Sequence, residues 1–451
     1  MDTSQATPAE PTRKPGLLIN RNFALLWSGQ SISVIGDAIF TTTLILWIAT
    51  SLAKNQSWAP LAVSGIFLAM SVPTMVAGPI AGVFADRWDK RRTMLQMDAT
   101  RALLVLLLLL VAILPFKALI AWQLTAIYSF VALMNICTQF FNPSRFSLIG
   151  AIVEKPQLAR ASGLSQTVNS LATIIGPPLA TLLFFQVGVQ WALLLNALSF
   201  VASFFAILLI HAPHMPSPTT STQKNPFFSE LNEGIRFSLR SRVLVTLAIT
   251  GVLITLGSGA LSALGIFFVT QNLHASAQVF GFLNSAYGVG AIAGAMVTGL
   301  LAQRLGIIRT FWLSVLLAGV ALLLYARLTD LTLALIVVFL IGILISAVNV
   351  VVAPLVLQTT PQELIGRASS VLGLVLSLAA AFSFTLAGYL DSVVLRDFHT
   401  TAFGMSIGPV DTIYMGTAIL VIASGLYALF SLQRITLSAK PAPQPVATAE
   451  Q

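Results

Sequence analysis

Asp37, Asp98 and Arg101 are ionisable side chains that lie inside long apolar segments of this chain. A charge at the centre of a bilayer costs at least about 3 kcal/mol on insertion scales, so each of these residues is expected to have a functional role or a charged partner. Asp37 has no basic residue within a helical turn, and loss of hydration favours the protonated form of an isolated carboxyl group. We therefore expect Asp37 to bind and release protons, and Asp98 is the second candidate for this role.

Each of these residues also has a simpler interpretation. Asp37 could be a carboxyl group at the outer mouth of a cavity, hydrated or hydrogen-bonded to Ser33 or Thr41, which lie one turn away on either side. Asp98 and Arg101 are three residues apart and share a helix face. For this pair, an internal ion pair that braces a gate is the favoured prediction over a contact with substrate.

A short charged run, GVFADRWDKRR at 82–92, separates two of the apolar segments. It fits a tight cytoplasmic turn between two spanning helices, because Lys and Arg concentrate in cytoplasmic loops. Asp86 could pair with loop cations and with a helix N-terminus, which would latch the cytoplasmic side. The alternative is a plain topology anchor. The predicted gate residues are Gly82, Asp86, Arg87, Lys90, Arg91 and Arg92.

The composition excludes a soluble protein. The chain is 57% hydrophobic and 9% charged, whereas soluble domains carry about 25% charged residues. A spanning helix needs about 20 mainly apolar residues, and the segments are too uniformly apolar for barrel strands. We predict an all-α membrane protein with twelve transmembrane helices, at approximately 22–50, 60–85, 93–114, 119–141, 162–187, 190–210, 243–270, 278–302, 307–326, 331–358, 366–390 and 409–432.

The two halves of the chain echo each other. Gly82 and Arg87 align with Gly299 and Arg304, and LARAS at 158–162 aligns with IGRAS at 365–369. A duplicated six-helix unit is the simplest account, and such repeats mark transporter folds. We expect a disordered N-terminus (1–20), a first bundle (21–210), a linker with an amphipathic helix on the cytoplasmic membrane face (211–242), a second bundle (243–434) and a disordered tail (435–451).

The fifth apolar segment contains ATIIGPPLATLL, with Ala172, Gly176 and Pro177 at helical spacing or adjacent. A Gly-Pro pair within a helix removes a backbone hydrogen bond and permits a bend. A bend against a small-residue face suits a helix that repacks between two states. The alternative is that Pro is simply commoner in membrane helices than in soluble ones.

Uncharged polar and aromatic residues are scattered through the other spans. Buried amides in lipid either bridge helices or face a cavity. For any single residue packing is the simpler interpretation, but together they favour a cavity with few fixed charges and a hydrophobic or weakly polar cargo. The cavity candidates are Phe40, Asn135, Gln139, Gln166, Asn169, Asn284, Tyr287 and Asn349.

The sequence contains no motif for nucleotide binding, metal binding or nucleophilic catalysis. The sequence has no P-loop, zinc-ligand spacing or nucleophile elbow, and its four histidines fall at or beyond span ends. We therefore expect no enzyme, no metal and no cofactor, with a proton gradient as the energy source. We expect the carboxyl groups of Asp391, Asp397 and Asp411, at the outer ends of spans, to be solvated.

The loop at 82–92, its weaker copy after the eighth span, the twelve spans and the fifth-span motif together resemble the major facilitator superfamily of secondary transporters over about 20–435. NRNFALLWSGQSISVIGDAIF near the start and PSRFSLIGAIVEKPQLARASGL at 143–164 look like the bacterial branch that includes macrolide and siderophore exporters. The motif around Gly176 and Pro177 matches the drug:proton antiporter pattern in part, with Ala172 in place of its first glycine.

The resemblance implies alternating access by two six-helix bundles around a central site, with export driven by inward proton movement. The net charge is +9, and most Lys and Arg residues lie in the connections expected on one side of the spans. Arg145 is counted among these residues. This bias predicts an integral inner-membrane protein with both termini cytoplasmic. Expected partners are a small-molecule substrate, protons and membrane lipids, with no nucleic acid, and the chain is expected to be a monomer. The alternatives are an uptake symporter and a non-transporting membrane receptor on the same fold.

Overall fold

The computed structural model of the chain describes residues 19–113, 120–211, 227–362, 364–402 and 405–432. At 79, 82–87, 227–232, 402, 405 and 406 it describes the backbone alone. Contacts divide the chain into two compact units. The first unit holds residues 1–47 and 72–220, and the second unit holds 48–71 and 221–451. Each unit is described separately below.

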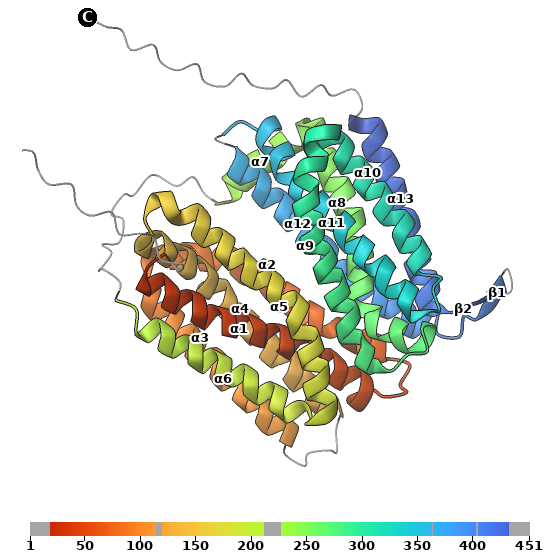
Figure 1. Cartoon of the computed structure of the whole chain (residues 1–451), viewed down its shortest axis with the longest axis horizontal. Helices are drawn as coiled ribbons and strands as arrows, with labels where there is room; N and C mark the ends of the chain where they lie inside the picture. Colours follow the sequence, from red (N-terminus) through yellow and green to blue (C-terminus); the bar gives the residue numbers. More distant parts are fainter. Residues whose placement is uncertain (1–18, 114–119, 212–226, 363, 403–404, 433–451) are drawn as a thin grey trace, which may run out of the picture. The chain divides into compact units, whose positions relative to one another are not determined.

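The first unit is built from helices that run side by side. In it α1 packs against α5 and α6, and α3 packs against α4 and α6 (Figure 1). The helix α2 begins among residues of the second unit and continues into the first. The helices are α1 (Arg21–Trp47, followed by a π-helical turn Ile48–Leu52), α2 (Ala59–Arg87), α3 (Lys90–Ile113), α4 (Ile120–Ile152), α5 (Leu158–Gln186) and α6 (Val189–Leu208), with a 3-10 turn at Lys155–Gln157.

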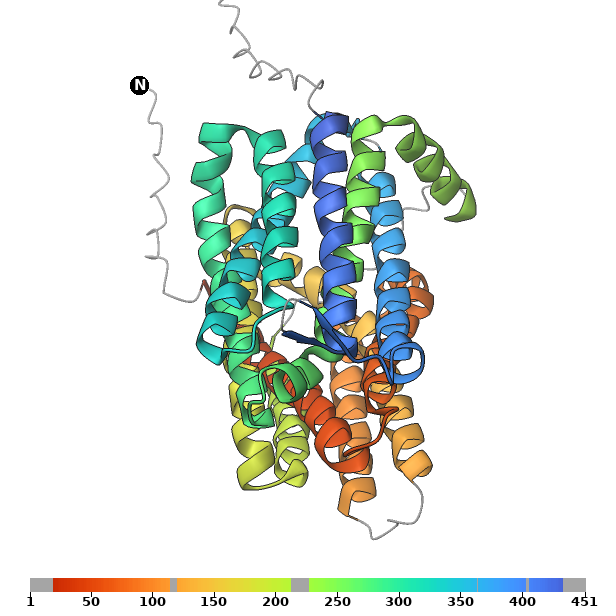
Figure 2. The same ribbon diagram turned by 90° about the vertical axis from the view of Figure 1, so that its right-hand side faces the viewer.

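The second unit contains the remaining helices and a short antiparallel hairpin. Figure 2 shows α8 (light green) and α13 (blue) side by side. Close pairs are also formed by α9 with α11 and by α8 with α12. The elements are α7 (Phe227–Arg240), α8 (Arg242–Phe267), α9 (Phe280–Leu305), α10 (Ile307–Tyr325), α11 (Leu331–Thr359), α12 (Ile365–Tyr389), α13 (Pro409–Leu432), β1 (Thr400–Ala402) and β2 (Met405–Ile407), with short helical turns at Phe268–Asn272, Ala277–Val279 and Leu390–Val394.

Local sequence explains where several helices begin and end. Asp330 caps α11 by accepting a hydrogen bond from the Leu333 amide at 2.9 Å, because the first amides of a helix lack partners within it. The turns between α5 and α6 and between α9 and α10 each place a glycine at positive φ, Gly188 at 96° and Gly306 at 84°. A side chain is rarely tolerated at such angles, so glycine permits these two tight turns.

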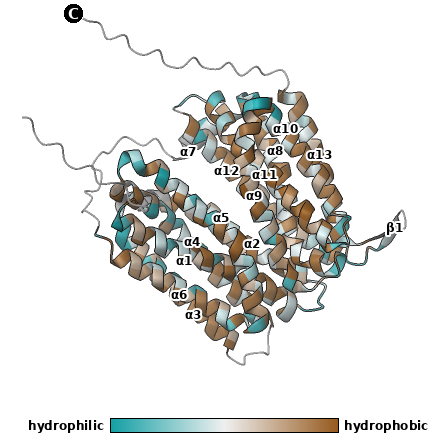
Figure 3. Ribbon diagram, viewed as in Figure 1, coloured by the Kyte–Doolittle hydropathy of each residue, from teal (hydrophilic) through white to brown (hydrophobic). Residues whose placement is uncertain are grey.

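Twelve of the described helices are long and apolar enough to cross a membrane, which confirms the predicted fold class. Apolar residues run along most of each helix, and hydrophilic residues gather near helix ends (Figure 3). The main difference in extent is α4, which was expected to end near 141 and continues to Ile152. Pro143 lies inside it. The added turns bury Leu148, Ile149 and Ile152 in the core of the first unit, which offsets the backbone hydrogen bond that proline removes.

Small residues let the helices of each unit approach closely. A Cβ atom on Gly176 of α5 would lie 2.5 Å from the Ala38 Cβ of α1, and one on Gly36 would meet Ser199 and Asn196 of α6. In the second unit, Gly290 and Gly294 of α9 face the α11 backbone at Phe339 and Ile343. This small-residue packing is the arrangement that holds helices together where lipid removes the hydrophobic driving force.

The helix α7 packs against the start of α12 in the second unit. Glu233 forms an ion pair with Arg367 at 2.5 Å, and a Cβ atom on Gly234 would lie 3.0 Å from the Arg367 carbonyl oxygen. Its Ile235 and Leu239 side chains are exposed. The placement of α7 on a membrane face stays a prediction, as do the boundaries expected for the linker and the two bundles. The expected disorder at 1–18 and 433–451 concerns residues outside those described.

Candidate functional site

Half of the predicted gate falls where the structure describes no side chains. Gly82, Asp86 and Arg87 end α2, and their side chains lie outside the described residues. After them Asp89 caps α3, because its carboxylate accepts a hydrogen bond from the Arg92 amide at 2.7 Å. The Lys90 ammonium donates to the Trp88 carbonyl at 3.0 Å. The gate itself remains a prediction.

Arg91 has a definite partner within the first unit. Its guanidinium donates to the carbonyl oxygens of Ile207 at 3.2 Å and Leu208 at 2.6 Å. These are the last two carbonyls of α6, at the end of the helix that carries its negative partial charge. Arg91 therefore ties the start of α3 to the end of α6, whereas the neighbouring Arg92 is exposed.

A charged pair is buried in the middle of the first unit. Asp98 and Arg101 of α3 form an ion pair, and Asp98 is 0% and Arg101 4% exposed. The second Asp98 oxygen accepts a hydrogen bond from the Ser203 hydroxyl at 2.6 Å, and Ser203 in turn accepts one from the Gln30 amide at 2.9 Å. Buried charges persist only when paired and hydrogen-bonded in this way.

The Arg101 guanidinium is also held between two aromatic rings. Its central carbon lies 4.4 Å from the centroid of Phe141 and 4.5 Å from that of Phe200. A cation over an aromatic face gains electrostatic energy that grows as water is excluded. The ion pair that the sequence predicts is therefore present and braces α3 against α4 and α6, and its connection to a gate stays a prediction.

Asp37 is half-buried in α1, within electrostatic range of both Asp98 and Arg101. In the part of the chain that the structure describes, its carboxyl group makes no hydrogen bond, whereas its backbone carbonyl accepts one from Thr41 at 3.0 Å. The alternative in which Ser33 or Thr41 holds the carboxyl group therefore does not match this arrangement. The role of Asp37 as a group that gains and loses a proton stays a prediction.

The fifth-span motif lies beside Asp37. Gly176 of α5 contacts Ala38, the next residue after Asp37. Ala172 is 2% exposed and Pro177 is buried on the same helix. This proximity could not be predicted from the sequence, because the two segments are far apart along the chain. The backbone next to Asp37 packs directly against α5 at Gly176.

Arg145 was expected in a cytoplasmic connection, but it lies inside α4 because that helix is longer than expected. It borders a small cavity of about 20 Å³ in the first unit, together with Gln30, Ser165 and Asn169. Its Nε atom is buried and has no hydrogen-bond partner among the described residues, and its guanidinium lies 5.3 Å from the Phe146 ring centroid. Arg101 is therefore not the only basic residue within the described spans.

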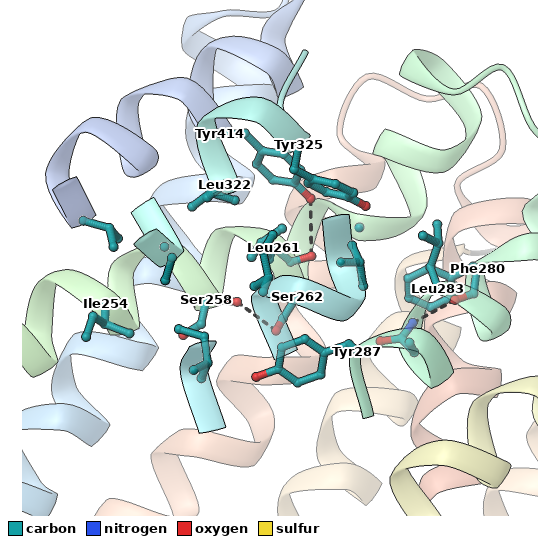
Figure 4. A pocket seen from close by; sticks show the side chains of 18 residues that line it. Ile254, Ser258, Leu261, Ser262, Phe280, Leu283, Tyr287, Leu322, Tyr325 and Tyr414 are labelled. Atoms are coloured by element: carbon teal, nitrogen blue, oxygen red, sulfur yellow. Dashed lines mark hydrogen bonds between the residues drawn. The ribbon is translucent and has the colours of Figure 1, made fainter. Parts of the chain in front are cut away.

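A larger cavity, of about 200 Å³, lies wholly within the second unit. It is a partly open pocket lined by residues of α8, α9, α10, α11 and α13, and none of its 18 lining residues is charged. Figure 4 shows Tyr325 and Tyr414 at one end and Tyr287 at the other, with Ser262 between them. The predicted cavity residues Asn284 and Tyr287 both line it.

An aromatic cluster closes one end of this cavity. The Phe268 ring lies 4.4 Å from Tyr325 and 5.3 Å from Tyr414, measured between ring centroids. The Tyr414 hydroxyl donates to the Leu261 carbonyl at 3.4 Å. Aromatic pairs at such distances stabilise each other beyond their buried area, so mutual aromatic packing forms this end of the cavity.

The remaining cavity candidates lie elsewhere. Asn135 and Gln139 of α4 form a polar cluster with Thr74 of α2, with Thr74 Oγ1 3.1 Å from Asn135 Oδ1 and 3.2 Å from Gln139 Nε2. Phe40 is 3% exposed in the core, and Gln166 and Asn349 are exposed. The structure brings only Asn284 and Tyr287 together in the larger cavity.

Two of the three aspartates expected in solvent are buried. Asp391 is 7% and Asp411 6% exposed, whereas Asp397 is exposed as expected. Asp411 is held by Asn272, by the Gly408 amide at 2.9 Å and by Arg327 at 3.8 Å. Asn272 and Arg327 come from distant segments, so their contacts with Asp411 could not be predicted from local sequence. The described residues contain no group of three or more His, Cys, Asp or Glu that could hold a metal.

The family model and the relatives that match this chain all describe membrane transport proteins. Residues 16–396 match the profile of a family described as transmembrane secretion effectors. The chain is 22% identical to macrolide efflux protein A of Streptococcus pyogenes, over 81% of the chain and 88% of that protein. It is 29% identical to the enterobactin exporter EntS of Escherichia coli O1:K1 / APEC, over 64% of the chain and 67% of that protein.

Solved structures agree on the fold. A bacterial homologue of the iron transporter ferroportin, in an inward-facing state, matches with a TM-score of 0.71 and 14% sequence identity. The match covers 90% of this chain and 98% of that one. At this identity the likeness concerns the fold alone.

Proposed function

Because the chain belongs to the transmembrane secretion effector family of major facilitator superfamily transporters, we propose that it exports hydrophobic or amphipathic small molecules in exchange for protons. The family consists of transporters rather than enzymes, and the twelve spans make this chain an integral membrane protein. The named efflux relatives support export over uptake. Macrolides and siderophores are the cargo classes that their names suggest.

The observation that carries the proton part of the proposal is the half-buried Asp37 beside a buried ion pair. Asp98 already has Arg101 and Ser203 as partners, so protonating it would break two contacts. Asp37 has no such partner among the described residues, and it can therefore change charge at lower structural cost. Asp98 is the alternative coupling residue.

The proposal includes the predicted surroundings of the transporter. The proton gradient supplies the energy, so no cofactor takes part, and the chain works as a monomer with lipids around its apolar faces. The inner membrane of a bacterium is the location, with both termini in the cytoplasm. The loop at 82–92 closes the cytoplasmic side while the opposite side is open.

Inverted membrane vesicles with an imposed proton gradient test this proposal. Wild-type vesicles should accumulate a macrolide, and a protonophore should abolish the accumulation. Asp37→Asn should lower the initial rate at least tenfold, because the amide cannot bind the proton. The matched control Asp397→Asn changes an exposed carboxyl group and should leave the rate unchanged.

The result also separates the two carboxyl groups. Full uptake by Asp37→Asn with loss in Asp98→Asn would assign coupling to Asp98. Uptake that a protonophore does not affect would contradict proton coupling altogether.

A further inference from the structure

The larger cavity belongs to one unit alone, and its size limits what it can hold. Its volume is about 200 Å³. A cavity of about 150 Å³ in another protein binds benzene, whereas sites for drug-sized ligands occupy about 300–1,000 Å³. The cavity can therefore receive one ring, or one ring-bearing part of a larger molecule.

The walls favour a flat apolar group. Leu283 and Phe280 line one side in Figure 4, and Ile254 lies on the opposite side. The rings of Tyr325 and Tyr414 form one end, held by their contacts with Phe268. Aromatic rings bind other rings through offset or edge-on contacts, so a planar ring gains more here than a branched chain of equal volume.

Two of the polar groups on the walls, Asn284 and Ser262, each leave an oxygen that can accept a hydrogen bond. The Asn284 amide nitrogen donates to the Phe280 carbonyl at 2.9 Å, which leaves its oxygen directed elsewhere. The Ser262 hydroxyl donates its only proton to the Ser258 carbonyl at 2.9 Å, so its oxygen can only accept a further bond. A ligand with a hydroxyl or N–H donor would satisfy these oxygens.

The lining also disfavours a charged ligand. None of the lining residues carries a charge, and moving an unpaired ion from water into such surroundings is far more costly than moving a neutral group. A neutral ligand meets no such penalty.

From this geometry we infer that the cavity of the second unit is a subsite for a single uncharged aromatic ring that carries a hydrogen-bond donor, the phenol class of group. As part of the transport cycle this subsite rests on the proposed function, since it would hold one ring of the exported molecule. Binding to it, however, requires no proton gradient and can be measured alone.

Fluorine NMR of 4-fluorophenol with the purified full chain in lipid nanodiscs tests the subsite. Ser262→Phe places a ring in the cavity from an exposed position on its wall. The matched control is Ser370→Phe, because Ser370 is also exposed in the second unit and its hydroxyl bonds to the carbonyl four residues earlier at 2.9 Å. Ser370 does not line the cavity.

We expect Ser262→Phe to weaken 4-fluorophenol binding at least tenfold, and Ser370→Phe to leave it unchanged. The anion 4-fluorobenzoate should bind at least tenfold more weakly than 4-fluorophenol to the wild type. If Ser262→Phe is not monodisperse, Ser258→Leu fills the cavity from the preceding turn and should give the same loss.

Equal binding by the wild type and a well-folded filled variant would overturn the subsite, because the probe would then be in lipid or elsewhere on the protein. Equal binding of the anion would overturn the preference for a neutral ring. Probe binding without proton-driven uptake of any tested cargo into the inverted vesicles would support the subsite and contradict the proposed function. Transport without probe binding would do the reverse.

Discussion

The two units both pack spanning helices together, but they differ in the side chains that they bury. The first unit holds the Asp98–Arg101 ion pair between two aromatic rings, with Asp37 nearby. The second unit holds a cavity whose lining has hydroxyl, amide and aromatic groups but no charge. Carboxyl groups are buried in the second unit as well, at Asp391 and Asp411, but they do not line its cavity.

The difference lies in side chains rather than in the course of the backbone. The repeated LARAS and IGRAS segments begin α5 at Leu158 and α12 at Ile365, so both copies start a helix. Yet Arg367 pairs with Glu233 of α7 at 2.5 Å, a partner helix that comes from the linker. A shared helical plan thus leaves the chemistry of each unit free to differ.

Removing one member of the buried ion pair should have the largest effect. Asp98→Ala leaves the Arg101 charge uncompensated in the first unit and should lower the stability by about 3–5 kcal/mol. Thermal unfolding of the purified full chain in detergent measures this loss. The matched control Asp397→Ala removes an exposed carboxyl group and should melt like the wild type.

A double variant sharpens the same test. Asp98→Ala combined with Arg101→Met removes both charges, so it should recover much of the lost stability. If Asp98→Ala melts at the wild-type temperature, the first unit does not depend on its buried pair and the contrast between the units disappears.

In the second unit, we expect stability to fall when a glycine at a close helix contact is replaced by a larger residue. Gly290→Val places a branched side chain where a Cβ atom would lie 2.9 Å from the Phe339 carbonyl carbon of α11 and 3.1 Å from its Cα. Because backbone cannot move aside as a side chain can, we expect a loss of about 1–3 kcal/mol. Gly299→Val on the same helix is the control, since its Cβ would meet nothing within 4 Å.

Melting of the two glycine variants distinguishes steric overlap from the effect of valine on a helix. Similar losses in both would mean that the close contact between α9 and α11 contributes little. A loss in Gly290→Val alone should also weaken ring binding, because Tyr287 and Asn284 are carried by α9.

The smallest expected effect is that of replacing Arg91, which tests whether this residue holds α3 against α6 or acts in the predicted gate. Arg91→Ala loses two hydrogen bonds to the end of α6 and should cost about 1 kcal/mol, measured by thermal unfolding. Arg92→Ala, at an exposed neighbour, should leave the melting temperature unchanged. A fall in transport with normal melting in Arg91→Ala would instead favour the gate role.

Hydropathy was enough to predict the helices, because a spanning segment must be long and apolar whatever it contacts. The same reasoning missed the last turns of α4, where Asn142, Pro143 and Arg145 resemble the end of a span. Those turns are helical because Leu148 and Ile152 find partners in the core. Such burial depends on distant segments and leaves little trace in local composition.

The site was predictable only in part for a related reason. Asp98 and Arg101 are close in sequence, so their pairing followed from helical spacing. Asn284 and Tyr287 were foreseen as polar or aromatic residues within a span. Tyr325 and Tyr414 lie near span ends, where aromatics usually mark the membrane interface, and only the packing around Phe268 reveals their role.

The second unit is discontinuous in the sequence, and this has a consequence for biosynthesis. Residues 48–71 belong to it: Phe67 stacks on Phe384 at 4.7 Å, and the Leu61 amide donates to the Ser392 hydroxyl at 3.1 Å. Roughly 300 further residues are translated before these partners emerge, which takes about 15–60 s at typical rates. During that interval the nascent segment lacks the partners that it has in the folded second unit.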